Sequence, residues 1–85
     1  MELQKDEILL NEIKKIISKI TRIDIKKITN NASLRNDLFI DSLQASQIVF
    51  LIEEQYKIKI DEVEIFNVEN VLDVVEVLKE YLLEK

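Results

Sequence analysis

Few side chains in this sequence of 85 residues could carry covalent chemistry, and the Ser42 hydroxyl is the one in the most suggestive place. Ser42 lies in the tripeptide Asp41-Ser42-Leu43, between a polar segment and an almost wholly apolar one. Taken alone, the tripeptide is a very weak signal of a reactive site and is far more typical of a helix cap. The sequence contains no His, Cys, Gly or Pro. Their absence excludes a thiolate nucleophile, a Ser-His-Asp triad, a Cys/His zinc site and glycine-rich phosphate loops.

The missing base decides what Ser42 can do. Without a His, nothing suitable in this chain would take the proton of the serine hydroxyl, so a self-contained hydrolase is not a sensible interpretation. We therefore predict that the chain is not an enzyme and that it has no catalytic residue and no metal site. If Ser42 reacts, another protein must make it react.

The elements that must position Ser42 follow from the hydrophobic pattern. Apolar residues at helical spacing predict an amphipathic helix from Glu7 to Ile20. Its core stripe would be Leu9, Ile13, Ile16, Ile17 and Ile20. The period is lost over residues 21–41, where Asn, Asp and Ser supply turn chemistry. A long loop in so small a domain is usually functional, so we expect a site at the end of this loop.

A second helix is predicted to start at Asp41 or Ser42 and to end at Tyr56. Asp41 can accept from the backbone of the first turn, and Gln44 can reach back to complete a capping box. The inward stripe would be Ala45, Ile48, Val49, Ile52 and Tyr56. Because that stripe is already complete, we expect Leu43 and Phe50 to be exposed on the opposite face. The predicted partner-binding residues are Leu43, Gln44, Gln47, Phe50, Leu51, Glu53 and Glu54.

The remaining chain predicts two further helices. Residues 57–60 are expected to form a loop, and Asp61–Phe66 a short helical turn capped by Asp61 with Glu64 three residues later. A last helix is predicted over Val71–Leu83, with Asn70 as its cap. Its core stripe would be Val71, Val74, Val75, Leu78 and Leu82. The expected fold is an all-α, small four-helix bundle, with three longer helices, one short helix and a long loop between helices one and two. Residues 1–85 would form a single domain.

Charge and composition narrow the class of partner. The net charge is 12 − 17 = −5, divided into 7 − 5 = +2 over residues 1–32 and 5 − 12 = −7 over residues 33–85. Without clustered cations, nucleic acid is not an expected partner. The longest aliphatic or aromatic run, residues 48–52, is far too short to span a membrane, and no signal peptide is expected. We expect a cytoplasmic monomer.

Several segments in order and at fixed spacing give a more specific indication. Residues 28–34 (Ile-Thr-Asn-Asn-Ala-Ser-Leu) are followed by Asp37-Leu38, by Asp41-Ser42-Leu43 and by Glu53-Glu54. Over nearly the whole chain this pattern resembles the acyl carrier proteins. The resemblance implies that a separate phosphopantetheinyl transferase esterifies Ser42, flanked by Asp41 and Leu43, with 4′-phosphopantetheine from coenzyme A.

The same resemblance implies a role in transport. The thiol of the phosphopantetheine arm would hold acyl intermediates as thioesters, and the chain would carry them between acyl-transferring and synthase enzymes of fatty-acid or specialised lipid or polyketide biosynthesis. Four positions depart from the family pattern: Phe39 replaces a usual Gly, Asp61 replaces a Pro, and Gln44 and Gln47 replace acids. These departures bear on which partner enzymes the chain binds, and not on attachment at Ser42. An aminoacyl or D-alanyl carrier and an unmodified helical interaction module remain as alternatives.

Overall fold

The helices of the structure agree with the expected fold class. The computed structural model describes residues 2–83, with side chains described from Asp6 onward. It contains α1 (Glu2–Thr21), a short 3-10 turn η1 (Ile25–Lys27), α2 (Ser42–Tyr56), α3 (Glu62–Phe66) and α4 (Val71–Leu83). Within residues 2–83, the extended structure is limited to an isolated antiparallel bridge between Ser33 and Asn70. The all-α, four-helix prediction is therefore confirmed.

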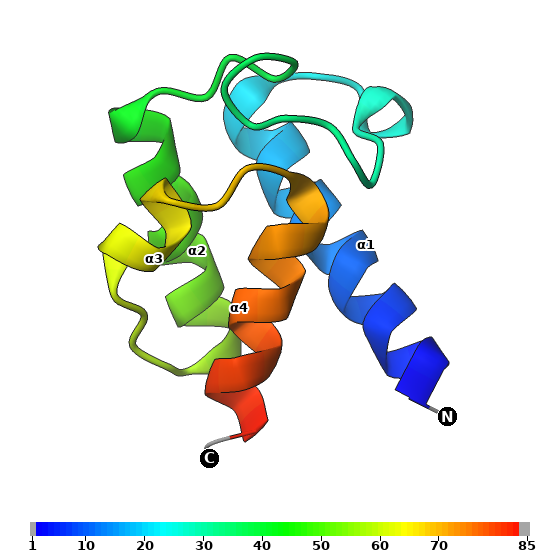
Figure 1. The fold of residues 1–85 in the computed structure, drawn as a ribbon, viewed down its shortest axis with the longest axis vertical. Coiled ribbons are helices and arrows are strands. Elements are labelled where there is room, and N and C mark those ends of the chain that lie inside the picture. Colours follow the sequence, from blue (N-terminus) through cyan, green and yellow to red (C-terminus); the bar gives the residue numbers. More distant parts are fainter. Residues whose placement is uncertain (1, 84–85) are drawn as a thin grey trace.

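The three longer helices pack around one core. α1 packs against both α2 and α4, and it runs in the opposite direction to both of them (Figure 1). α3 lies beside α2 and contacts α4 as well. No helix among the described residues is long and apolar enough to cross a membrane.

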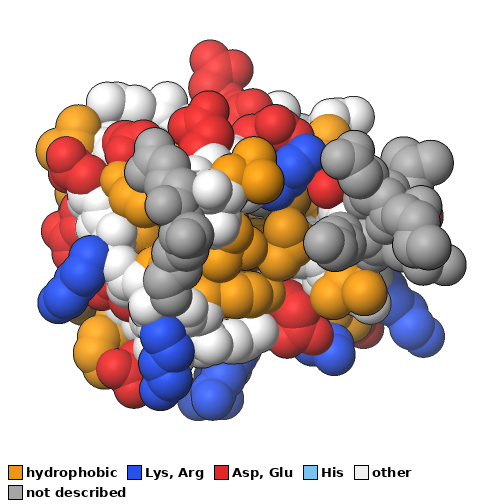
Figure 2. All heavy atoms as spheres, turned by 90° about the horizontal axis from the view of Figure 1, so that it is seen from below, with side chains coloured by type: hydrophobic (Ala, Val, Ile, Leu, Met, Phe, Trp, Pro, Cys, Tyr) orange, Lys and Arg blue, Asp and Glu red, His pale blue; other side chains and the backbone are white. Residues whose placement is uncertain are grey.

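The core confirms most of the predicted stripes. Ile13 and Ile17 of α1 and Ile52 of α2 are completely buried, as is Val71 at the start of α4. Among the described residues, every buried side chain is hydrophobic. At the end of the molecule where both termini lie, hydrophobic side chains are also visible at the centre of the face, surrounded by acidic and basic ones (Figure 2).

α1 begins earlier than its apolar stripe indicates. The sequence predicts a start at Glu7, whereas the helix begins at Glu2. The prediction was wrong because it relied on apolar spacing, while residues 2–5 (Glu-Leu-Gln-Lys) have good intrinsic helix propensity. The next residue is tied to the fold, since the Lys79 ammonium of α4 lies 3.2 Å from the Asp6 carboxylate.

The long loop between α1 and α2 is held in place by backbone hydrogen bonds. The Leu34 N–H donates to the Glu69 carbonyl at 2.9 Å, and the Val71 N–H donates to the Ala32 carbonyl at 3.3 Å. Within the loop, the Ile40 N–H donates to the Leu34 carbonyl at 2.8 Å. The loop is therefore clamped to the segment that precedes α4, which fixes where α2 must begin.

α3 is too short to be stable alone, and side chains fix both of its flanks. The predicted cap is present, because the Asp61 carboxylate accepts from the Val63 N–H at 3.1 Å. The Glu64 carboxylate instead accepts from the Tyr81 hydroxyl of α4, and the oxygen of that hydroxyl accepts from the Asp61 N–H. This hydrogen bond to Glu64 raises the pKa of the Tyr81 phenol. At the last residue of α3, the Phe66 carbonyl accepts from the Arg35 guanidinium at 2.7 Å.

The backbone at Phe39 favours glycine. Phe39 has φ 55°, in the left-handed region, between the buried side chains of Leu38 and Ile40. This conformation costs a non-glycine residue roughly 1–2 kcal/mol, and the greater freedom of glycine in the unfolded chain offsets roughly 0.5–1 kcal/mol of that. The Phe39 side chain is 76% exposed, so its removal forfeits little packing.

We therefore expect Phe39→Gly to raise the free energy of unfolding of the apo protein by about 0.5–1 kcal/mol in urea denaturation. Phe39→Ala is the matched control, because alanine removes the ring and keeps the cost of the left-handed backbone. Equal stability of the glycine and alanine variants would contradict this explanation of the strain.

Candidate functional site

Ser42 is the first residue of α2 and lies on the surface. The chain reaches it from the buried side chain of Ile40 through Asp41, which is the N-cap of the helix and is also exposed. The start of α2 lies at the end of the molecule formed by the long loop, away from both termini (Figure 1). The hydroxyl is therefore accessible to another protein.

The predicted capping box is confirmed atom by atom. The Asp41 carboxylate accepts from the Gln44 N–H at 2.8 Å, and the Gln44 side-chain carbonyl accepts from the Asp41 N–H at 3.4 Å. The Asp41 backbone carbonyl accepts from the Ala45 N–H at 2.9 Å, the first α-helical hydrogen bond. These bonds fix the direction in which the first turn presents Ser42.

The electrostatics of the first turn suit an anion. The positive end of a helix dipole favours negative charge, and the N–H groups of the first turn can donate to it. α2 has no acidic residue in its first turn that would repel an anion. A phosphodiester on Ser42 would therefore meet a favourable field. The Asp41 carboxylate beside it is already hydrogen-bonded within the cap.

The exposed face of α2 is uncharged over its first two turns. Leu43 is 69% exposed and Phe50 is 58% exposed, which confirms the expected exposure of both side chains. Gln47 lies between them and Glu54 follows one turn later, and both are exposed. Because these four residues are spaced by three or four positions, they lie on one side of the helix.

The other predicted partner-binding residues are placed differently. Gln44 is half-buried in the capping box, and Leu51 is half-buried against the core. The Glu53 carboxylate accepts from the Ile60 N–H at 2.8 Å, so it holds the loop between α2 and α3. A change at Glu53 would therefore disturb this loop as well as the surface charge.

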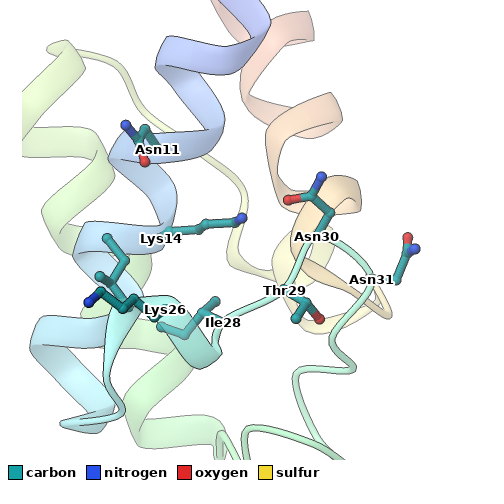
Figure 3. Close-up of a pocket in the computed structure, with 8 residues that line it drawn as sticks. Asn11, Lys14, Lys26, Ile28, Thr29, Asn30 and Asn31 are labelled. Carbon is teal, nitrogen blue, oxygen red and sulfur yellow. The ribbon is translucent and has the colours of Figure 1, made fainter.

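One hollow of the surface lies away from the start of α2. Its volume is about 550 Å³, and it lies between α1, η1 and the following loop. Amide and ammonium groups line much of it, and Lys14 extends toward Asn30 (Figure 3). An acyl chain placed there would displace water from these polar groups without hydrogen-bonding to them, so the hollow is a poor site for apolar cargo. Within residues 2–83, no group of three or more His, Cys, Asp or Glu side chains could hold a metal ion.

Sequence reasoning did not predict the exposure of two apolar side chains. Phe39, just before the cap, is 76% exposed, and Val63 of α3 is 59% exposed. The signal for Phe39 was present in the apolar run Leu38-Phe39-Ile40, in which the outer two residues are buried and the middle one must point outward. No comparable signal marks Val63, because a five-residue helix has too few positions to define a buried stripe.

Comparisons with known proteins agree with this geometry. A model of the family described as "Phosphopantetheine attachment site" matches residues 11–78, most of the chain. An acyl carrier protein of Brachyspira hyodysenteriae is 34% identical over 74 residues, which cover 86% of this chain and 95% of that protein. One of Buchnera aphidicola subsp. Schizaphis graminum is 49% identical over 51 residues, which cover 60% of this chain and 65% of that protein.

A solved structure supports the fold alone. The crystal structure of an acyl carrier protein from Thermotoga maritima superposes with a TM-score of 0.79 at 20% identity, and the match covers 93% of this chain and 92% of that one. From the family model and the relatives together, the chain belongs to the acyl carrier proteins. Its cofactor is covalently attached 4′-phosphopantetheine.

The capping box gives a direct test of how Ser42 is positioned. Replacing Asp41 with Ala removes the acceptor for the Gln44 N–H and should lower the free energy of unfolding by about 1 kcal/mol. Asp41→Asn keeps an acceptor at the same place and should stay within about 0.5 kcal/mol of the parent. The measurement is urea denaturation of the apo protein. Equal losses in both variants would show that the charge of Asp41, and not its hydrogen bond, stabilises the start of α2.

Proposed function

We propose that Ser42 is the residue to which 4′-phosphopantetheine is attached. The observation that carries this proposal is an exposed serine hydroxyl on the first residue of a capped 15-residue helix, with no acidic residue in the first turn. The other serines fit less well. Ser33 lies in the clamped loop, where its hydroxyl accepts from the Asn36 N–H at 3.1 Å, and Ser46 is half-buried on α2.

The chain acts as a single monomeric, cytoplasmic carrier domain over residues 1–85, without catalytic activity of its own. The attached arm supplies a thiol that holds an acyl group as a thioester. A phosphopantetheinyl transferase loads the arm, and acyl-transferring and synthase enzymes of fatty-acid or specialised lipid or polyketide biosynthesis exchange the cargo. The absence of Cys supports this role, because no protein thiol competes for the thioester.

Partners dock on the start of α2 mainly through apolar contacts. Four residues of the predicted surface are exposed and lie along one side of the helix, namely Leu43, Gln47, Phe50 and Glu54. The other three, Gln44, Leu51 and Glu53, are half-buried. Phe50 also borders a hollow of about 720 Å³ at the C-terminal half of α2, next to Glu54 and Tyr81. An aromatic side chain beside a concave surface is a typical interface anchor.

The attachment proposal predicts one arm per chain. Incubating the apo protein with coenzyme A, magnesium and a promiscuous transferase should add a single phosphopantetheine by intact mass, and Ser42→Ala should abolish the addition. Ser33→Ala and Ser46→Ala are matched controls that should be modified like the parent. The helical circular dichroism of all three variants should match that of the parent. An adduct on Ser42→Ala, or none on the parent with a competent transferase, would refute the attachment site.

Cargo length should affect stability. A fatty chain that enters between the helices buries methylene groups, each worth about 0.8 kcal/mol when fully desolvated. The core that it would enter is wholly hydrophobic among the described residues. The melting temperature should therefore rise from the two-carbon to the long-chain form of the loaded protein. Identical melting temperatures would show that the chain stays outside or that the cargo is of another type.

Docking through an uncharged helix start should depend weakly on salt, because few charges near Ser42 can be screened. Phe50→Ala should weaken binding to the cognate synthase more than Glu54→Gln does, since central aromatic anchors carry more interface energy than charges at the rim. Glu54 is the suitable acid for this comparison because it is exposed, whereas Glu53 holds a loop. Affinity measured at low and high salt decides the question. A steep loss with salt together with an unaffected Phe50→Ala would indicate electrostatic docking.

A further inference from the structure

Phe39 is placed in a way that gives no benefit to the fold. Its φ of 55° lies in a region that glycine occupies at no steric cost, and its ring is 76% exposed. Among the large hydrophobic side chains that the structure describes, only Leu83, the last residue of α4, is more exposed. The ring therefore contributes little to the core, while its Cβ makes the local backbone less favourable.

The neighbours of Phe39 leave its backbone no alternative. Leu38 and Ile40 are both buried, at 5% and 8% exposure. The Leu38 N–H donates to the Ser33 carbonyl at 3.0 Å, and the Ile40 N–H donates to the Leu34 carbonyl at 2.8 Å. The chain must turn between two fixed points, so residue 39 takes the left-handed conformation and its side chain points away from the core. Strained residues that the surrounding structure holds in place occur preferentially at functional sites.

The position of Phe39 relative to Ser42 indicates what covers it. They are three positions apart in the sequence, so their Cα atoms lie no more than about 11 Å apart. A transferase that brings coenzyme A to the Ser42 hydroxyl must contact the protein surface around this serine. Leu43, directly after Ser42, is exposed and apolar as well. Exposed apolar side chains therefore lie on both sides of Ser42 in the sequence, with the N-cap Asp41 as the acid next to the serine.

We propose that Phe39 is a docking anchor for the phosphopantetheinyl transferase that modifies Ser42, with its ring held in an apolar socket beside the transferase active site. The inference rests on the proposed attachment at Ser42 and adds a residue outside α2 to the docking surface. A docking role also explains why a phenylalanine stands at this position. The residue lowers the stability of the uncomplexed protein, so its benefit must lie in a complex. Phe39 acts in binding and takes no part in the chemical step.

The test is the steady-state kinetics of arm transfer to the apo protein by the transferase of the organism that encodes this chain, with coenzyme A and magnesium. Phe39→Gly and Phe39→Ala should each raise the KM for the apo protein about tenfold, with kcat within about twofold of the parent, as for loss of an aromatic anchor. Phe39→Tyr keeps the ring and should stay within about twofold of the parent KM. Ile8→Ala is the matched surface control, since Ile8 is 61% exposed in the first half of α1, the helix that begins at the end of the molecule opposite to the start of α2.

Stability separates docking from folding in this experiment. Phe39→Gly should unfold at higher urea than the parent, so a raised KM in that variant cannot be due to loss of structure. A KM for Phe39→Gly within twofold of the parent would overturn the anchor role while leaving attachment at Ser42 intact. A parent protein that acquires no arm, or acquires it at another residue, would instead refute the proposed function.

Discussion

The position of the start of α2 depends on how the loop before it is anchored. Two side chains of this loop must be buried, and the residue between them must be exposed. Leu38 and Ile40 enter the core, and Phe39 between them must point outward. The Ile40 N–H bond to the Leu34 carbonyl closes this turn, and the Leu34 N–H bond to the Glu69 carbonyl attaches it to the segment before α4. Asp41 then caps the helix, so the direction in which Ser42 faces is set by contacts from distant parts of the chain.

Much of this arrangement could be predicted from the sequence because it is encoded locally. The stripes of α1, α2 and α4 have helical spacing, and the capping box of Asp41 and Gln44 is a pattern of two residues three apart. The cap of α4 was equally local, since the Asn70 side chain accepts from the Asp73 N–H at 2.9 Å. Ser42 could be singled out for the same reason, because it lies in a local cap motif. Its expected role as the attachment residue came instead from the resemblance, which rests on several segments in order and at fixed spacing.

Long-range contacts could not be predicted in the same way. The sequence predicts that Glu64 takes part in the cap of α3. In the structure its carboxylate instead accepts from the Tyr81 hydroxyl, which lies 17 positions away. The early start of α1 was missed because helix propensity, without an apolar stripe, extends it. Glu53 was predicted only as a surface residue for partner binding, and its hydrogen bond with the Ile60 N–H was not predicted. A sequence does not show which backbone groups a loop leaves unpaired.

The central claim is that Ser42 carries the arm, and the native protein tests it most directly. Trypsin should cleave the chain after Arg35 and Lys57, which leaves Ser42 and Ser46 on one peptide. Fragmentation of this peptide from protein isolated from its own organism would locate the modification. We expect 4′-phosphopantetheine on Ser42, free or with its acyl cargo. An arm on Ser46, or an unmodified peptide from cells in which other carriers bear the arm, would contradict it.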